Sequence, residues 1–109
     1  MIITDAELAA MIARIAEAIH PERIILFGSH ARGEADENSD LDLLVVVDED
    51  FSNRSRWREL QRIRKLVASF PMSKDIMLYS RDEVARWRDS ANHIIAHVLR
   101  EGRLLYERP

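Results

Sequence analysis

The segment that decides the fold is residues 27–45, which read Phe-Gly-Ser-His-Ala-Arg-Gly-Glu-Ala-Asp-Glu-Asn-Ser-Asp-Leu-Asp-Leu-Leu-Val. A short apolar run over residues 23–27 stops at Gly28 and Ser29. Ten residues then intervene before Asp40, and a second apolar run covers residues 41–47. Short apolar runs bounded by turn residues are typical of buried strands, and the second run is rich in β-branched valine. The segment therefore predicts two buried strands joined by a polar loop.

Two acids stand where the second strand begins, at Asp40 and Asp42. Side chains two residues apart on a strand lie on the same face, so these carboxylates are expected to be neighbours. Neighbouring carboxylates repel each other, and a divalent cation that prefers oxygen ligands, such as Mg²⁺ or Mn²⁺, would offset their charge. A strand-end acid pair that faces solvent has the same pattern. The residues alone leave both interpretations open.

The turn after the first strand has the composition of a phosphate-binding turn. Glycine at position 28 allows a close approach of backbone to a ligand, and a helical turn that begins at Ser29 would point free N–H groups outward. Ser29 adds a hydroxyl donor, and Arg32 and Gly33 follow. The turn lacks the Gly-Lys-Ser/Thr of a Walker A loop. A plain strand–turn–helix junction is the alternative interpretation.

Apolar spacing and punctuation predict the remaining elements. Thr4 with Glu7 and Ser80 with Glu83 form the capping-box pattern that begins a helix. We expect helices over residues 5–20, 57–70 and 81–100, and further strands over 74–79 and 104–106. Gly102 is the expected C-cap of the last helix. The resulting order, α-β-β-α-β-α-β, describes a sheet with helices packed on it, in one domain that covers residues 1–109.

Composition excludes several classes of protein. The sequence has no cysteine, which excludes a disulfide framework, a thiolate metal site and a cysteine nucleophile. Its longest apolar run, residues 43–47, is far shorter than the roughly 20 residues of a membrane span. The N-terminus does not read as a signal peptide. We therefore expect a cytoplasmic protein without a membrane partner.

The charges are unevenly distributed along the chain. Residues 34–50 hold eight acids and no base, whereas residues 54–65 hold six bases and one acid. Such runs are usually solvated surface. The basic stripe of Arg54, Arg58, Arg62 and Lys65 is most simply an exposed helix face, with an acidic partner or nucleic acid as the alternative. The net charge of −3 argues against a direct nucleic-acid role.

Other conspicuous residues read as structural. His93 and His97 have metal-ligand spacing, but no Glu follows His93 and no third ligand is evident. Arg88 and His93 form an Arg-x₄-His pattern that resembles the ribonuclease motif of HEPN proteins, which are helical bundles, so we interpret it as chance. Trp57 and Trp87 lie on apolar stripes, for which core packing is the favoured interpretation and a partner anchor the alternative.

The combination of strand, Gly-Ser, ten residues and Asp-x-Asp resembles the signature of the polymerase-β-like nucleotidyltransferases. The motifs Gly28-Ser-His-Ala-Arg-Gly33 and Ser39-Asp-Leu-Asp-Leu43 resemble the minimal nucleotidyltransferase (MNT) branch of that family, and the resemblance extends through Asp75 to Gly102-Arg-Leu-Leu-Tyr106. His30 departs from the pattern, because Arg or Lys often stands there. The resemblance implies a small two-layer α+β palm fold, with a mixed sheet of about four strands and three main helices.

The resemblance also implies a nucleotidyltransferase mechanism. The metal-binding and catalytic roles fall to Asp40, Asp42 and Asp75. These three acids would hold two Mg²⁺ ions, for which Mn²⁺ can substitute. Asp75 would also help to deprotonate the attacking hydroxyl. The nucleotide-binding roles fall to Gly28, Ser29 and Arg32, and ATP is the expected substrate.

A partner protein is implied as well. MNT proteins commonly pair with a HEPN-type toxin, and members of the family are antitoxins that transfer AMP from ATP onto a toxin tyrosine. We therefore expect a protein adenylyltransferase that works in a hetero-oligomer with its toxin. Two alternatives remain: an antitoxin that neutralises its partner by binding alone, and a nucleotidyltransferase subunit whose small-molecule acceptor is held by a separate subunit.

Overall fold

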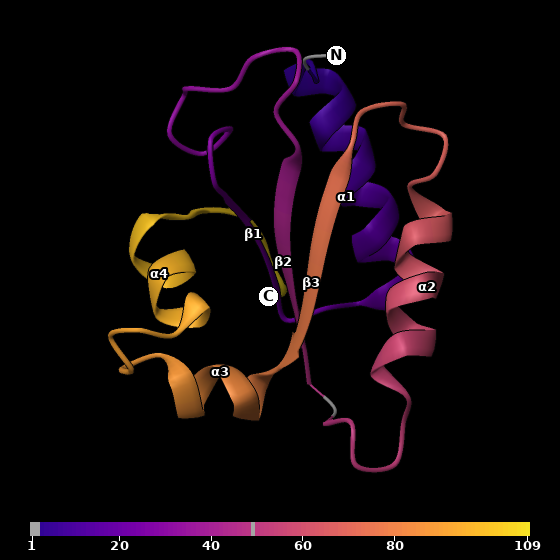
Figure 1. The fold of residues 1–109 in the computed structure, drawn as a ribbon. Coiled ribbons are helices and arrows are strands. Elements are labelled where there is room, and N and C mark those ends of the chain that lie inside the picture. The colour runs from indigo at the N-terminus through magenta and orange to yellow at the C-terminus, as the bar shows by residue number, and fades with distance from the viewer. Residues whose placement is uncertain (1–2, 49) are drawn as a thin grey trace.

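The computed structural model describes residues 3–48 and 50–109. Within these ranges the chain forms four helices and four strands (Figure 1). In chain order these are α1 (Asp5–Ile19), β1 (Arg23–Phe27), β2 (Leu41–Val47), α2 (Arg56–Leu66), β3 (Lys74–Ser80), α3 (Arg81–Trp87), α4 (Ile94–Glu101) and β4 (Arg103–Glu107). The expected α+β class is confirmed, and all four strands lie at the expected positions. None of the described helices has the length and apolarity needed to cross a membrane.

The four strands form one mixed sheet in the order β3-β2-β1-β4. β2 and β3 are parallel, whereas β1 is antiparallel to both β2 and β4. The C-terminal end of β1 therefore lies at the same end of the sheet as the beginnings of β2 and β3. This topology brings Phe27, the residue before Gly28, next to Asp42 near the start of β2.

Helices cover both faces of the sheet, which corrects the expected two layers. α1 and α2 pack on one face, where Leu41, Leu43 and Val45 of β2 are fully buried. α3 and α4 pack on the other face, over Leu44 and Val46 (Figure 1). A strand buried on both faces reads as a continuous apolar run without polar alternation, which is what residues 43–47 show. The additional partial layer lies on the face that carries the acids.

The long helix expected over residues 81–100 is two helices, and this expectation was wrong. The Ser80 capping box begins α3 as predicted, but α3 ends at Trp87 and α4 begins after its N-cap His93. Asp, Ser and Asn between them compete for backbone hydrogen bonds and favour turns over helix. Gly102 caps the C-terminus of α4 as expected, through a hydrogen bond from its N–H to Val98 O at 2.8 Å.

α2 ends at Leu66, four residues before the predicted end at Phe70. The N–H groups of Val67, Ala68 and Phe70 donate to carbonyls three residues earlier, at 3.3, 3.4 and 3.1 Å, so the chain tightens into turns after the helix. The core interpretation of Trp57 is also wrong: this side chain is 64% exposed. Ile63 and Val67 supply the buried contacts of this segment instead, and Trp57 lies on the outward side of α2.

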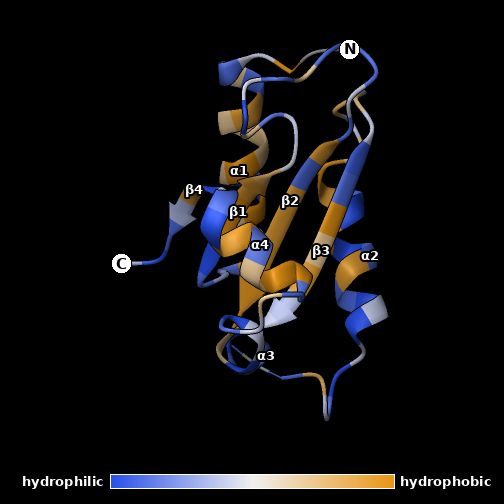
Figure 2. Ribbon diagram, turned by 60° about the vertical axis from the view of Figure 1, so that its left-hand side comes forward, coloured by the Kyte–Doolittle hydropathy of each residue, from blue (hydrophilic) through white to orange (hydrophobic). Residues whose placement is uncertain are grey.

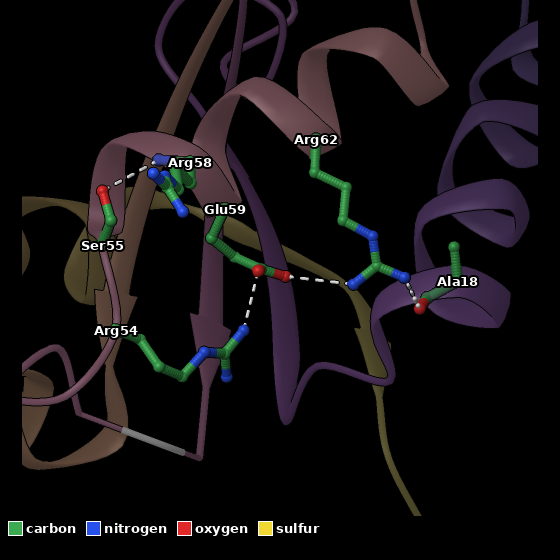
Figure 3. A network of polar contacts seen from close by, with 6 residues as sticks. All are labelled: Ala18, Arg54, Ser55, Arg58, Glu59 and Arg62. Carbon is green, nitrogen blue, oxygen red and sulfur yellow. Dashed lines mark hydrogen bonds and ion pairs between the residues drawn. The ribbon is translucent and has the colours of Figure 1, made fainter.

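The basic stripe on α2 is partly engaged in contacts with the protein itself. Glu59 accepts from Arg54 at 2.7 Å and from Arg62 at 3.5 Å (Figure 3). Arg62 also donates to Ala18 O at 3.2 Å, which ties α2 to the end of α1. Arg54 and Arg62 are exposed, as a solvated face predicts, and the contact of Arg62 with Ala18 O also joins α2 to α1.

Candidate active site

The central residue of the candidate site is Asp42, near the start of β2. In the sheet it is the register partner of Phe27 on β1 and of Asp75 on β3. Parallel strands in register place paired side chains on the same face, so Asp42 and Asp75 both lie on the face that α3 and α4 cover further along. Asp40 precedes Asp42 by two residues at the same end of the sheet. Figure 2 shows hydrophilic segments at the adjoining upper ends of β2 and β3.

The charges of Asp40 and Asp75 act on the carboxyl of Asp42. Burial raises the pKa of the Asp42 carboxyl, and the charges of Asp75 and Asp40 raise this pKa further. The neighbouring bases His30 and Arg32 lower it, but by less. The site is thus a group of like charges whose mutual repulsion a bound cation would relieve.

Gly28 is the point where the turn after β1 meets Asp42. It has a φ of +75°, in the left-handed region that favours glycine. A Cβ atom at this position would lie 2.2 Å from Asp42 Oδ2, which is closer than two such atoms can approach. Only glycine lets the backbone of the turn lie against this carboxylate, so the Gly-Ser motif and the Asp-x-Asp motif are one structural unit.

The expected turn of helix after Gly28 is a single tight turn over residues 28–33. The N–H groups of Ala31 and Arg32 donate to Gly28 O at 3.1 and 3.2 Å, and Glu34 N donates to Ser29 O at 2.9 Å. In the described ranges, the N–H groups of Ser29 and His30 have no backbone acceptor within this turn. Such amides at the start of a helical turn are suited to bind phosphate oxygens.

His30 links this turn to the acids, which sequence reasoning missed. Its Nδ1 lies 3.0 Å from the carbonyl oxygen of Asp40. Because a carbonyl oxygen only accepts hydrogen bonds, Nδ1 carries the proton in this contact and Nε2 is left for another group. The histidine that stands in place of the usual Arg or Lys therefore joins the turn to the residue that precedes β2.

Two features singled out in the sequence lie beside the cluster of Asp40, Asp42 and Asp75 rather than in it. Arg32 is exposed, contacts Glu34 at 3.3 Å, and lines a cavity next to Gly28. His93 caps α4, where its Nδ1 accepts from Ile95 N, and it stacks on Trp87 with ring centroids 4.5 Å apart. The Arg88–His93 pattern accordingly falls in the turn between two helices, which supports the interpretation of a chance match.

The residues around Asp42 fit a divalent cation by their chemistry. They offer carboxylate oxygens, the ligands that Mg²⁺ and Mn²⁺ prefer, and they hold net negative charge together. As the side chains stand, no three His, Cys, Asp or Glu residues of the described ranges converge into a closed ligand set. Asp40 and Asp75 are exposed, and exposed carboxylates are free to rotate toward an ion.

Replacing Asp42 by asparagine should raise the melting temperature of the metal-free protein at pH 7. Folding raises the pKa of the Asp42 carboxyl, so its contribution to stability is present below the pKa of the unfolded chain and is lost as the pH rises through the pKa of the folded protein. Asparagine is neutral at every pH and shows no such loss. The difference between variant and wild type should shrink as the pH falls, and Mg²⁺ should raise the melting temperature of the wild type only. A variant that is less stable by the same amount at every pH would contradict this description of the site.

Residues 11–109 match the family described as Polymerase beta, Nucleotidyltransferase. This match covers most of the chain, so the protein belongs to the polymerase beta nucleotidyltransferase family. The resemblance inferred from the Gly-Ser and Asp-x-Asp motifs is thereby confirmed.

Two similar proteins come from Methanocaldococcus jannaschii. One, named "Putative protein adenylyltransferase MJ0141", is 40% identical over 57 residues, which are 52% of this chain and 54% of that protein. The other, named "Putative protein adenylyltransferase MJ0604", is 34% identical over 85 residues, 78% of each chain. The match therefore spans about half the length of the first relative and more than three quarters of the second.

Solved structures share the fold. A putative nucleotidyltransferase from Sulfolobus solfataricus has a TM-score of 0.64 at 19% identity, over 93% of this chain and 78% of that one. A toxin–antitoxin complex with AMP-PNP has a TM-score of 0.59 at 24% identity, over 91% and 73%. A mutant of the toxin–antitoxin MntA–HpeT has a TM-score of 0.57 at 21% identity, over 90% and 70%. The nucleotidyltransferase fold inferred from the sequence is confirmed.

Proposed function

We propose that this protein is a Mg²⁺-dependent adenylyltransferase that transfers AMP from ATP to a tyrosine hydroxyl of a HEPN-type toxin and so acts as its antitoxin. The observation that carries the proposal is the register of Asp42 with Asp75 beside the Gly28 turn. The relatives named protein adenylyltransferases and the fold shared with toxin–antitoxin structures support the donor and the kind of partner.

Asp40, Asp42 and Asp75 would hold the Mg²⁺ ions. The ions would supply positive charge to offset the negative charge of the triphosphate and of the transition state. The N–H groups of Ser29 and His30 and the Ser29 hydroxyl bind the phosphates that leave. In this arrangement most of the catalytic effect comes from positioning and electrostatics rather than from covalent chemistry by the protein.

The transfer is an in-line displacement at the α-phosphorus of ATP. The acceptor oxygen forms a bond to this phosphorus, and the bond from the phosphorus to the oxygen that bridges to the β-phosphate breaks. Pyrophosphate leaves with that oxygen. The acceptor proton passes to a carboxylate oxygen of Asp75, which lies on the β3 side of Asp42 and faces solvent.

The openness of the site favours an acceptor carried by a protein. Asp40 and Asp75 are both exposed, and Asp75 lies on β3, one of the two edge strands of the sheet. A tyrosine on the surface of a partner can reach such an edge. A small free acceptor would gain little from a site with so few walls on this side, because ligand pockets for small molecules usually bury most of the ligand.

ATP binding should depend on Mg²⁺ or Mn²⁺ and on the turn. Calorimetric titration with Mg²⁺-ATP is expected to show saturable binding that a chelator abolishes. Ser29→Ala removes one hydroxyl donor, worth about 0.5–1.5 kcal/mol, so the Kd should rise roughly two- to tenfold. Ser52→Ala, at the opposite end of the sheet, is the matched control and should bind like wild type. ATP binding that is indifferent to chelator would overturn this part of the proposal.

A further inference from the structure

The edge of the sheet opposite β3 is apolar. β4 forms this edge and pairs with β1 alone (Figure 2), and its three central residues are Leu104, Leu105 and Tyr106. Leu105 and Tyr106 pack partly against the core on the α1 face. Leu104 is the register partner of Ile25, whose cluster lies on the α4 face, and it is 50% exposed. Edge strands usually carry charged residues or proline, because an apolar edge invites association with another chain.

An open groove of about 700 Å³ extends this apolar edge onto α1. Leu8, Ile12 and Leu105 are among the apolar residues that line the groove. Ala9 and Ala13 also line it and are exposed, and their short side chains let another surface approach the backbone of α1 closely. Extended apolar surface of this kind marks a site where another molecule packs.

The charges at the two ends of β4 indicate which molecule that is. Arg103 opens the strand and Glu107 ends it, both are exposed, and in the described part of the chain neither has an ion-pair partner. Two copies of β4 that run antiparallel and centre on Leu105 would place Arg103 of each copy opposite Glu107 of the other. The strand is therefore its own complement under a two-fold rotation, and two-fold dimers are the commonest assemblies of identical chains.

The irregular pairing of β4 with β1 limits how two copies can meet. The register shifts between Ile24 and Ile25, which leaves one extra residue in β4. Such bulges disrupt the hydrogen-bonding ladder at an edge. We therefore expect contact through side chains rather than one continuous sheet, with the apolar groove at the centre and the charged ends of β4 at the rim, as is typical of protein interfaces.

We infer that the face formed by α1 and β4 binds a second copy of this chain in a two-fold dimer, with Arg103 of each copy facing Glu107 of the other. The inference does not rest on the proposed function. In the sheet order β3-β2-β1-β4, the strand that carries Asp75 is the edge farthest from β4. The dimer therefore leaves the edge beside each candidate active site open to an acceptor.

Sedimentation velocity of the whole chain over a series of concentrations tests the inference, and the wild type should sediment as a dimer. Arg103→Glu and Glu107→Arg should each raise the Kd of the dimer at least tenfold, because each sets like charges opposite each other twice. An equimolar mixture of these two variants should form the dimer again, since opposite charges then face each other. Arg58→Glu, at an exposed position of α2, is the matched control and should sediment like the wild type.

Ala13→Glu tests the apolar part of the interface. It places a charge in the groove at an exposed helical position where glutamate is well tolerated, so the variant should be a monomer with the circular dichroism of the wild type. A wild type that stays monomeric up to about 100 µM would overturn the inference and leave the face to a different protein. A dimer that all three interface variants leave intact would place the interface elsewhere, and failure of the mixed variants to associate would contradict the antiparallel arrangement. These results leave the proposed function untouched.

Discussion

Replacement of Asp40 and Asp42 together by asparagine is expected to reduce AMP transfer by roughly a thousandfold or more. Loss of a single preorganised electrostatic contact to a transition state typically costs about 10²–10³ in rate, and this variant removes both charged groups of the Asp-x-Asp motif. The domain should stay folded, because Asn is close to isosteric with Asp. The substitution also removes the repulsion between the negative charges of Asp40, Asp42 and Asp75.

The measurement is the initial rate of AMP incorporation into the partner from labelled ATP, with circular dichroism to verify the fold. A matched double variant, Asp5→Asn with Asp89→Asn, removes two exposed acids outside the site and should keep the wild-type rate. Turnover near the wild-type value by the Asp40 and Asp42 variant would rule out the assignment of the site.

Gly28→Ala is expected to lower transfer about a hundredfold by moving the turn away from Asp42. The added Cβ would lie 2.2 Å from Asp42 Oδ2, so either the carboxylate or the backbone must shift. Displacements of about 1 Å in a catalytic site can cost 10²-fold in rate. The φ of +75° adds strain of about 1–2 kcal/mol to the folded state.

Gly33→Ala separates these two effects. Gly33 has a similar φ of +72°, but a Cβ there would meet no atom within 4 Å. The Gly33→Ala variant should therefore lose stability as Gly28→Ala does, but it should keep most of the wild-type transfer rate. Equal losses of activity in the two variants, measured as kcat/KM with Mg²⁺-ATP, would show that contact between turn and carboxylate has no special role.

Most of the fold could be predicted because its signals are local. The run over residues 41–47 and the capping boxes at Thr4 and Ser80 act through neighbours in the sequence, and the structure has these elements where they were expected. The failures arise where tertiary packing decides. The break between α3 and α4 lies in a segment whose apolar spacing suits a helix, and Val84 and Ile95 on either side of it are buried in the same cluster against the sheet.

The candidate site, too, could be predicted where its signals are local in the sequence and not where they depend on tertiary structure. Asp40, Asp42 and the Gly-Ser turn stand out in the sequence, because their spacing follows from one strand–loop–strand unit. The partnership of Asp42 with Asp75 depends on the register of two parallel strands, for which periodicity carries no signal, so it came from the family resemblance alone. The contact of His30 with Asp40 O likewise requires three-dimensional placement.

The most direct test of the central claim is the intact mass of the proposed partner, a HEPN-type toxin, after incubation with this protein and Mg²⁺-ATP. We expect the mass to increase in steps of one AMP, with the modification on tyrosine, and no increase with the Asp40 and Asp42 variant or with chelator. The modified toxin should stay inactive after the two proteins are separated. An unchanged mass, together with equal neutralisation by wild type and variant, would contradict the account and identify an antitoxin that acts by binding alone.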